Sequence, residues 1–243
     1  DEAVRFVRAE GYSVHDPICF GVACCGQVAH AEELQQAIYS ALVAGNAQQC
    51  QSLVTTAYLY GMTVPAICDG PLTKSLIRIG ELWQHGDDGI AIEHVASCIV
   101  IQVIENLRQK INRVDNNALV AIGGGSIEQH YLLPSLMVAI TLQDAGFHSI
   151  NLGANTPDGA VLAAARQHKP ALVWRSISGV IRPEQVANEV CQLAEELGPI
   201  PLIIGGSDVH KLHLGCAKRV HVISNLCELG AFARAMTLTK TPT

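Results

Sequence analysis

The sequence predicts an α + α/β protein, in which an antiparallel four-helix bundle precedes a doubly wound sheet of five parallel strands. Over residues 30–114, apolar residues recur with a helical period and the connections are short, which is typical of packed helices. Over residues 115–243, short apolar runs alternate with helical stretches, which is the pattern of βαβ units. Residues 1–29 precede both parts, and we interpret them as an extension or linker.

The helical part is expected to hold four helices. In the first, Leu34, Ile38 and Ala41 fall on one helical face. In the third, Pro65 is tolerated near the helix start, whereas Gly70–Pro71 predicts a break or a kink. The expected ranges are 32–43, 47–59, 64–83 and 89–110.

The strands of the second part are short, and each one ends in small or polar residues. Because parallel strands end at the same edge of a sheet, these residues are expected to face the crevice where α/β folds bind ligands. Aromatic residues make up only 5% of the chain, so the cores are expected to be aliphatic. The expected strands are 118–122, 149–153, 171–174, 201–204 and 220–223.

The loop after the first strand carries the most informative pattern, Glu128-Gln129-His130, which follows a glycine run at 123–125. A carboxylate two residues before a His can accept the proton of the ring nitrogen that faces away from a ligand. That bond fixes the tautomer and makes the other nitrogen a better metal ligand. A solvent-facing loop His is the simpler interpretation of this pattern when it is taken alone.

The downstream spacing changes this interpretation, because Ser176-Ile177-Ser178 and Gly205-Gly206 follow at the ends of later strands. The order resembles the cobalamin (vitamin B12) binding domain, whose motif is Asp-x-His-x-x-Gly, then a Ser-x-Leu-type pair, then Gly-Gly. The resemblance implies a Rossmann-like (flavodoxin-like) sheet. It also implies that His130 is the lower axial ligand of cobalt. Ser176, Ser178, Gly205 and Gly206 are then expected to line the slot for the nucleotide tail.

Two positions depart from the family motif. Glu128 replaces the usual Asp and preserves the carboxylate. Leu133 replaces the usual Gly, so we expect it to narrow the tail slot or to reshape the start of the helix. After the second strand, Thr156 is expected to cap the next helix, and Asn155 and Thr156 are expected to border the corrin.

The helical part contains Trp83, nine intervening residues and then Glu93-His94. A buried Trp and a solvated Glu-His pair are the simpler interpretations. Placed before a cobalamin domain, however, the motif resembles the B12-dependent light-sensing transcriptional repressors of bacterial carotenoid synthesis. The resemblance implies that Trp83, Glu93 and His94 hold the adenosyl group of adenosylcobalamin. Light then breaks the cobalt–carbon bond and changes the oligomer, which is photochemistry rather than enzyme catalysis. The family places a cobalt-binding His directly after the Trp, where this chain has Gln84 and then His85.

Other classes of function compete with this one. A corrinoid carrier protein of a methyltransferase system also couples a helical bundle to a B12 domain, and it would use methylcobalamin. The Trp83 motif argues against a carrier, since a carrier must open the upper face of cobalamin to its partner enzymes. A mutase subunit needs a large substrate barrel, for which this chain has no room. A nucleotide- or flavin-binding domain is disfavoured because Glu128 would repel phosphate after the first strand.

Composition bounds the partners. The formal net charge is −6, and no basic run exceeds Lys218-Arg219, whereas a DNA-binding face normally needs a concentrated basic patch. We therefore expect no direct nucleic-acid site here, and either a protein partner or a DNA-binding domain outside this chain. No 18-residue uncharged run qualifies as a membrane span and no signal peptide is visible. These features predict a cytoplasmic protein, and the resemblance implies a homo-oligomer.

The nine cysteines are scattered, and no Cys-x-x-Cys occurs, so a zinc site is not expected. Cys24-Cys25 is the one local oddity. Its simpler interpretation is a pair of ordinary thiols in a cytosolic loop. The alternative is a redox site or an attachment point for a second chromophore such as a bilin.

Overall fold

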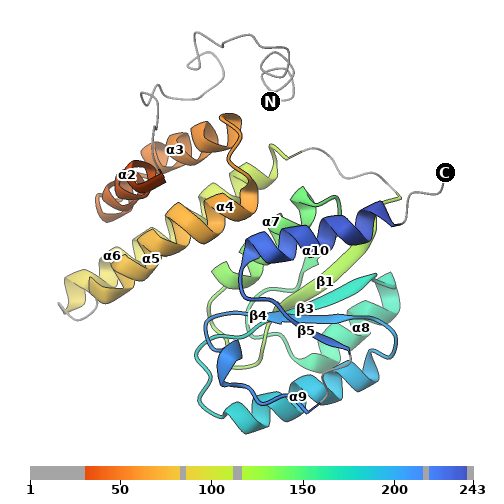
Figure 1. Ribbon diagram of the computed structural model, residues 1–243. Coiled ribbons are helices and arrows are strands. Elements are labelled where there is room, and N and C mark those ends of the chain that lie inside the picture. Colours follow the sequence, from red (N-terminus) through yellow and green to blue (C-terminus); the bar gives the residue numbers. More distant parts are fainter. Residues whose placement is uncertain (1–30, 83–85, 112–116, 216–218, 240–243) are drawn as a thin grey trace. The chain divides into compact units, whose positions relative to one another are not determined.

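The computed structural model describes residues 31–82, 86–111, 117–215 and 219–239 and divides the chain into two compact units (Figure 1). The helical unit comprises Asp1–Asn112, and the sheet unit comprises Arg113–Thr243. Several positions singled out from the sequence lie outside the described residues: Cys24-Cys25, Trp83, Gln84, His85 and Lys218.

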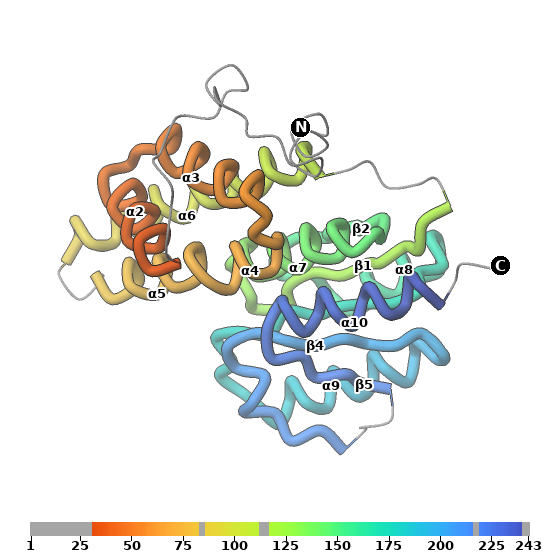
Figure 2. The backbone as a smooth tube through the Cα atoms, turned by 45° about the horizontal axis from the view of Figure 1, so that its top comes forward, coloured from red at the N-terminus to blue at the C-terminus, as the bar shows by residue number. Residues whose placement is uncertain are grey.

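The helical unit departs from the predicted count of four helices, because elements α4, η2 and α5 occupy the place of the third. Pro71 lacks an N–H group, and its ring conflicts with the carbonyl four residues earlier in a regular α-helix. The backbone accommodates it with a wider π-type turn, in which the Thr73 N–H reaches back to the Cys68 carbonyl. The three elements follow one another as one helical stretch (Figure 2). The helical elements are α2 (Ala31–Val43), α3 (Ala47–Leu59), α4 (Val64–Ile67), η2 (Cys68–Leu72), α5 (Thr73–Gly80) and α6 (Asp87–Arg108).

The core of this unit is aliphatic, as the composition predicts. Helix α2 packs against α3, η2, α5 and α6, and its residues Leu34, Ile38 and Leu42 are almost completely buried. Among the described helices, α6 is long and apolar enough to cross a membrane by length and composition, which the sequence analysis did not single out. One face of α6 is nevertheless buried at Val100 and Ile104, and the helix contacts α2, α3 and α5.

The sheet unit confirms the predicted five parallel strands, in the order β2-β1-β3-β4-β5. Helices α7 and α10 share one hydrophobic core with the sheet, and α8 and α9 share the other, so the sheet is covered on both faces (Figure 1). The strands are β1 (Val120–Gly125), β2 (His148–Asn151), β3 (Leu172–Ser176), β4 (Leu202–Gly205) and β5 (Val220–Val222). The helices are α7 (Leu133–Asp144), α8 (Asp158–His168), α9 (Pro183–Glu196) and α10 (Leu226–Leu238).

The glycine run at the end of β1 is explained by its neighbours. A Cβ on Gly123 would collide with the carbonyl and the indole ring of Trp174 on β3. A Cβ on Gly124 would lie 2.6 Å from the Gly153 carbonyl oxygen. Trp174 is 1% exposed and belongs to the core shared by the sheet with α7 and α10. The missing side chains on β1 therefore let the loop after β2 approach the sheet at its carboxyl edge.

Candidate functional site

The loops after β1, β2 and β3 are joined by hydrogen bonds at the carboxyl edge of the sheet. The Ser126 N–H and hydroxyl both donate to the Ser176 carbonyl at 3.1 Å. The Glu128 N–H donates to Asn155 Oδ1 at 2.9 Å, and the Asn155 N–H donates to the Gln129 carbonyl at 2.7 Å. Glu128 and Asn155 both adopt left-handed backbone conformations, so the meeting of these loops depends on two local turns.

The buried side chain of Arg175 links three segments at this edge by hydrogen bonds. Arg175 is 3% exposed, and its guanidinium donates to the Gly125 carbonyl at 3.1 Å, the Thr156 carbonyl at 2.7 Å and Asp158 Oδ1 at 2.8 Å. Burial lowers the pKa of Arg175 and raises the pKa of Asp158, and their mutual attraction opposes both shifts. The end of β1 and the start of α8 are thus fixed by one side chain of β3.

A pocket opens between the loop after β1 and the segment that joins β3 to α9. Its empty volume is about 460 Å³, open mouth included. It is lined by Ser126, Ile127, Glu128, Gln129, Ile177, Ser178, Gly179, Val180, Ile181, Arg182, Gln185, Val186 and Glu189. Of the residues expected to line a tail slot, Ser178 lines this pocket, whereas Ser176, the last residue of β3, is not among the residues that line it.

Two buried polar atoms at this edge have no hydrogen-bond partner among the described residues: Ser176 Oγ and Gln129 Oε1. Both residues are at most 4% exposed, and a buried polar group without a partner costs free energy. Gln129 lines the pocket, so a polar group of a ligand that enters there would lie near it, whereas Ser176 is not among the residues that line the pocket. The chemistry of this site therefore fits the base and sugar of a nucleotide tail.

The two glycines at the end of β4 make room for protein backbone. Gly206 has φ 123°, and a Cβ there would collide with the Ile177 carbonyl. A Cβ on Gly205 would lie 2.9 Å from the Ile223 carbonyl oxygen. The prediction that both glycines line the tail slot stays a prediction, since the described contacts explain them by close backbone approach.

His130 and Glu128 lie on the same loop, but the expected bond between them is replaced. The side chain of His130 is exposed, and Glu128 Oε1 accepts a hydrogen bond from Arg182 Nη2 at 2.8 Å. A guanidinium is always charged and makes a stronger bond to a carboxylate than a neutral imidazole does. Arg182 directly precedes α9, so this partner comes from the other side of the pocket.

The structure corrects the role expected for Thr156. Its hydroxyl donates to the carbonyls of Leu152 and Gly153 at 3.2 and 3.3 Å, and α8 begins after Pro157 without a side-chain cap. Thr156 is buried, whereas Asn155 is exposed at the edge of the sheet. Leu133 is half-buried as the first residue of α7, and its effect on the tail slot or on the helix start stays a prediction.

Asp208 was missed by sequence reasoning. Its carboxylate accepts the Val180 N–H at 2.7 Å and pairs with Lys211 Nζ at 2.9 Å. These bonds, with that to Lys211 first, lower the pKa of Asp208. Asp208 therefore clamps the wall formed by the segment after β3. Its only sequence signal is its place soon after Gly205-Gly206.

In the helical unit, Glu93 and His94 lie near the start of α6. Glu93 Oε1 accepts a hydrogen bond from the Ser97 hydroxyl at 3.0 Å, and Glu93 Oε2 lies 3.5 Å from His94 Nε2. The Glu93 side chain is 27% exposed and that of His94 is 73% exposed. The pair is thus accessible, with the carboxylate already oriented by Ser97.

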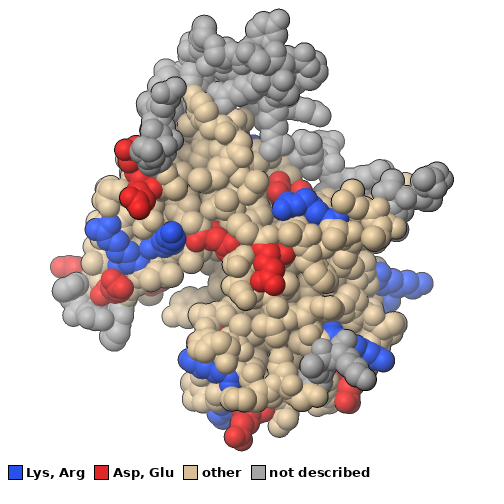
Figure 3. All heavy atoms as spheres, in the orientation of Figure 1, with Lys and Arg blue, Asp and Glu red and all other residues tan. Residues whose placement is uncertain are grey.

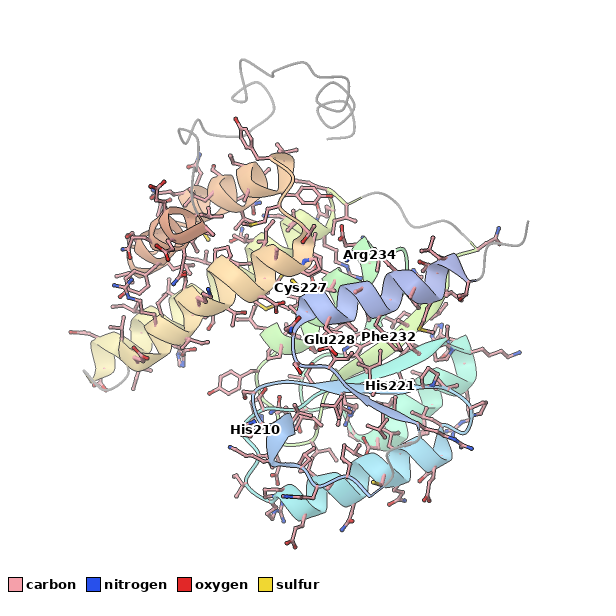
Figure 4. All side chains as sticks on the ribbon, in the orientation of Figure 1. His210, His221, Cys227, Glu228, Phe232 and Arg234 are labelled. Carbon is pink, nitrogen blue, oxygen red and sulfur yellow. The ribbon has the colours of Figure 1, made fainter. Side chains whose placement is uncertain are left out.

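The remaining histidines of the sheet unit do not gather at one point. His210 lies on the short helix η4 (Val209–Lys211), while His221 on β5 packs against Phe232 with ring centroids 5.1 Å apart (Figure 4). No group of three or more His, Cys, Asp or Glu residues placed to hold a metal occurs within the described ranges. A single His can still bind the cobalt of a corrin, because the macrocycle supplies the equatorial ligands.

The charged surface agrees with the composition. On the face in view, Lys and Arg are dispersed among Asp and Glu in the described part of the molecule (Figure 3). Lys211, one of the basic residues near the pocket, is paired with Asp208.

Comparisons with known proteins point to a corrinoid ligand. Residues 34–108 match the B12 binding domain family. The HTH-type transcriptional repressor CarA of Myxococcus xanthus is 26% identical over 205 residues, which are 83% of this chain and 68% of the repressor. The structure of the monomethylamine corrinoid protein of Methanosarcina barkeri aligns with a TM-score of 0.63 and 17% identity, over 85% of this chain and 100% of that protein.

These findings confirm the resemblance predicted from the sequence. Residues 34–108, in the helical unit, match a B12 binding domain, and the chain is similar over most of its length to a transcriptional repressor. Its fold resembles that of the monomethylamine corrinoid protein, and at this identity the likeness shows the fold alone. Together they support a cobalamin cofactor and a regulatory role.

Proposed function

We propose that this chain is a cobalamin-based light sensor that binds adenosylcobalamin with His130 as the lower ligand of cobalt. The observation that carries the proposal is the carboxyl edge of the sheet. There the exposed His130 directly follows Gln129, a buried residue of the pocket lining whose Oε1 has no partner, and the neighbouring strand β3 ends in Ser176, whose Oγ has no partner either. The B12 binding domain match and the repressor relative support the same ligand.

When bound, adenosylcobalamin supplies a cobalt–carbon bond that green light breaks. His130 would hold the cobalt, and Gln129, Ser176 and Ser178 would receive the nucleotide tail. In the helical unit, Trp83, Glu93 and His94 would contact the adenosyl group, as the resemblance implies. When light removes the adenosyl group, the helical unit loses the contact that stabilises its dark state relative to its light state. A ligand shifts a conformational equilibrium only by such a difference.

The first test is to bind adenosylcobalamin in the dark and to record absorption spectra before and after green light. Wild-type protein should give a stable dark complex that converts irreversibly, with a change of oligomer seen by light scattering. His130→Ala should alter the spectrum of the dark complex. His148→Ala is the matched control, because His148 is exposed at the opposite end of the parallel strands. A bound complex whose photochemistry equals that of the free cofactor would refute light sensing.

The corrinoid methyl carrier is the second candidate, and Glu93 separates the two. A light sensor uses Glu93 to recognise the adenosyl group, whereas a carrier is indifferent to that group. Glu93→Gln keeps the shape and the bond from Ser97 but removes the charge. It should weaken adenosylcobalamin binding about tenfold relative to methylcobalamin binding. Glu105→Gln, on the same helix and paired with Arg108, should change neither. An equal effect of Glu93→Gln on both ligands would favour the carrier.

A further inference from the structure

The Glu128–Arg182 ion pair spans the pocket mouth. Glu128 comes from the loop after β1, and Arg182 comes from the segment before α9. Both side chains line the pocket, and each is 58% exposed. Exposed pairs of this kind contribute only about 0–1 kcal/mol, so a stronger ligand of either partner can replace it.

The pocket has few other groups that can bind an anion. Arg182 is the one basic residue among those that line it, beside the carboxylates of Glu128 and Glu189. The backbone N–H groups of Gly179 and Val180 bond to Asp208. They are therefore directed to a protein carboxylate. Among the side chains that line this pocket, Arg182 is therefore the one that can attract a negative charge, against the repulsion of Glu128 and Glu189.

A polar ligand is expected in the same place on independent grounds. Gln129 lines the pocket, is 4% exposed and leaves Oε1 without a partner. The first turn of α9 also borders the pocket through Gln185 and Val186, and α9 has no side-chain cap. Its positive dipole end adds to the attraction of Arg182 for an anion.

We propose that Arg182 exchanges Glu128 for the phosphodiester of the cobalamin nucleotide tail. This inference rests on the proposed cobalamin binding and adds a positioning residue to it. The phosphodiester carries one negative charge, and a guanidinium can donate two parallel hydrogen bonds to it. The exchange frees the Glu128 carboxylate, which lies two residues from His130, to accept the proton of the imidazole nitrogen that faces away from cobalt.

The test compares cobalamin with cobinamide, a corrinoid that lacks the nucleotide and its phosphodiester. Equilibrium dialysis of hydroxocobalamin and diaquocobinamide gives both dissociation constants for wild-type protein and for Arg182→Gln. The variant should bind cobalamin about tenfold more weakly and bind cobinamide as wild type does. Added salt should weaken cobalamin binding more in wild type than in Arg182→Gln. Arg166→Gln is the matched control, since Arg166 is exposed in the last turn of α8.

The outcomes separate this inference from the proposed function. Equal loss of both ligands in Arg182→Gln, or no loss of either, would overturn the role of Arg182 while leaving cobalamin binding intact. Wild-type protein that binds cobinamide but not cobalamin would overturn it as well, because the tail would then not enter the pocket. Failure of wild type to bind either corrinoid would overturn both proposals. Far-UV circular dichroism should show that Arg182→Gln is folded, as expected for an exposed side chain.

Discussion

Arg175→Met tests whether one buried guanidinium organises the carboxyl edge of the sheet. The substitution keeps an unbranched side chain of moderate length but removes every donor. Asp158 then loses its cation while its side chain is only 29% exposed, and the Thr156 carbonyl loses a bond of 2.7 Å. The Gly125 carbonyl keeps the Thr156 N–H at 3.0 Å, so it stays satisfied.

The expected cost follows from these contacts. Removing one partner of a buried ion pair typically costs about 3–5 kcal/mol, because the other charge stays buried without compensation. Typical domains have a total stability of about 5–15 kcal/mol, so Arg175→Met should leave the sheet unit marginally stable. A saturating cobalamin ligand at about 100 times its dissociation constant would restore roughly 2.7 kcal/mol.

The assay is urea denaturation, together with hydrogen exchange of peptides from residues 117–215, which reports on the sheet unit by itself. Arg219→Met provides the control, because Arg219 is exposed and donates one bond of 2.9 Å to the Gly198 carbonyl. It should cost about 1 kcal/mol or less. In the double variant Arg175→Met/Asp158→Asn, part of the loss should be recovered, since no unpaired charge is left. A cost for Arg175→Met as small as that of Arg219→Met would refute the reasoning.

Three further predictions concern the same edge. Gly206→Ala should destabilise the protein by about 1–3 kcal/mol more than Gly198→Ala in urea denaturation, because only Gly206 has backbone in the way of a Cβ. Ser176→Ala should leave the ligand-free protein as stable or slightly more stable, since it removes an unpartnered hydroxyl, yet weaken cobalamin binding several-fold in dialysis. The unfolding free energy of Asp208→Asn should fall less steeply than that of wild type as the pH is lowered. The lowered pKa of Asp208 gives stability that is present above the unfolded pKa of about 4 and is lost as the pH falls through the folded pKa.

Each of these can fail in a specific way. Equal costs for the two glycine substitutions would mean that the turn after β4 relaxes away from the Ile177 carbonyl. A Ser176→Ala protein with unchanged cobalamin affinity would remove Ser176 from the tail slot. An acid profile of Asp208→Asn that parallels wild type would show that the clamp on Val180 contributes no pH-dependent stability.

The sheet could be predicted from the sequence because its signals are local. Apolar runs separated by helical stretches predict parallel strands, which the structure contains. The glycines before Ser126 were recognised as part of a loop motif. Their reason, the indole of Trp174 and the backbone near Gly153, appears only when β1, β2 and β3 are side by side. The number and order of the strands were therefore predictable, whereas the extension of β1 through Gly125 and the contacts that demand glycine were not.

The partners of the site residues could not be predicted, because they come from distant parts of the chain. Glu128 and His130 are near neighbours in sequence, which favoured a bond between them. Arg182 lies 54 residues further on, and a charged donor outcompetes a neutral one once the fold brings it near. Thr156 was expected to cap a helix, but buried carbonyls of its own turn take its hydroxyl. Competition between possible hydrogen-bond partners depends on the folded structure, and it leaves no pattern in the sequence around either residue.

In the helical unit, too, a local feature could be predicted from the sequence but its structural outcome could not. Gly70–Pro71 predicted a break or kink in the third helix, and the structure resolves the conflict with a π-type turn that keeps the chain helical. Pattern reasoning identifies the residue that cannot fit a regular helix. It does not say whether the chain breaks, kinks or widens, because that outcome also depends on packing against helices elsewhere in the chain, such as α2, which contacts η2.

The distribution of contacts suggests where a response to the upper ligand would arise. In the sheet unit, the loops at the carboxyl edge of the sheet are joined by bonds of Arg175, Asn155 and Asp208. The Glu128–Arg182 pair is exposed, so this contact can change at little cost in free energy. A surface held by several buried or charged bonds has little freedom to adopt a second state. In the helical unit, by contrast, Glu93 is oriented by one hydroxyl on the same helix. We therefore expect the sheet unit to act as a fixed holder of the lower face, and the conformational change to belong to the helices.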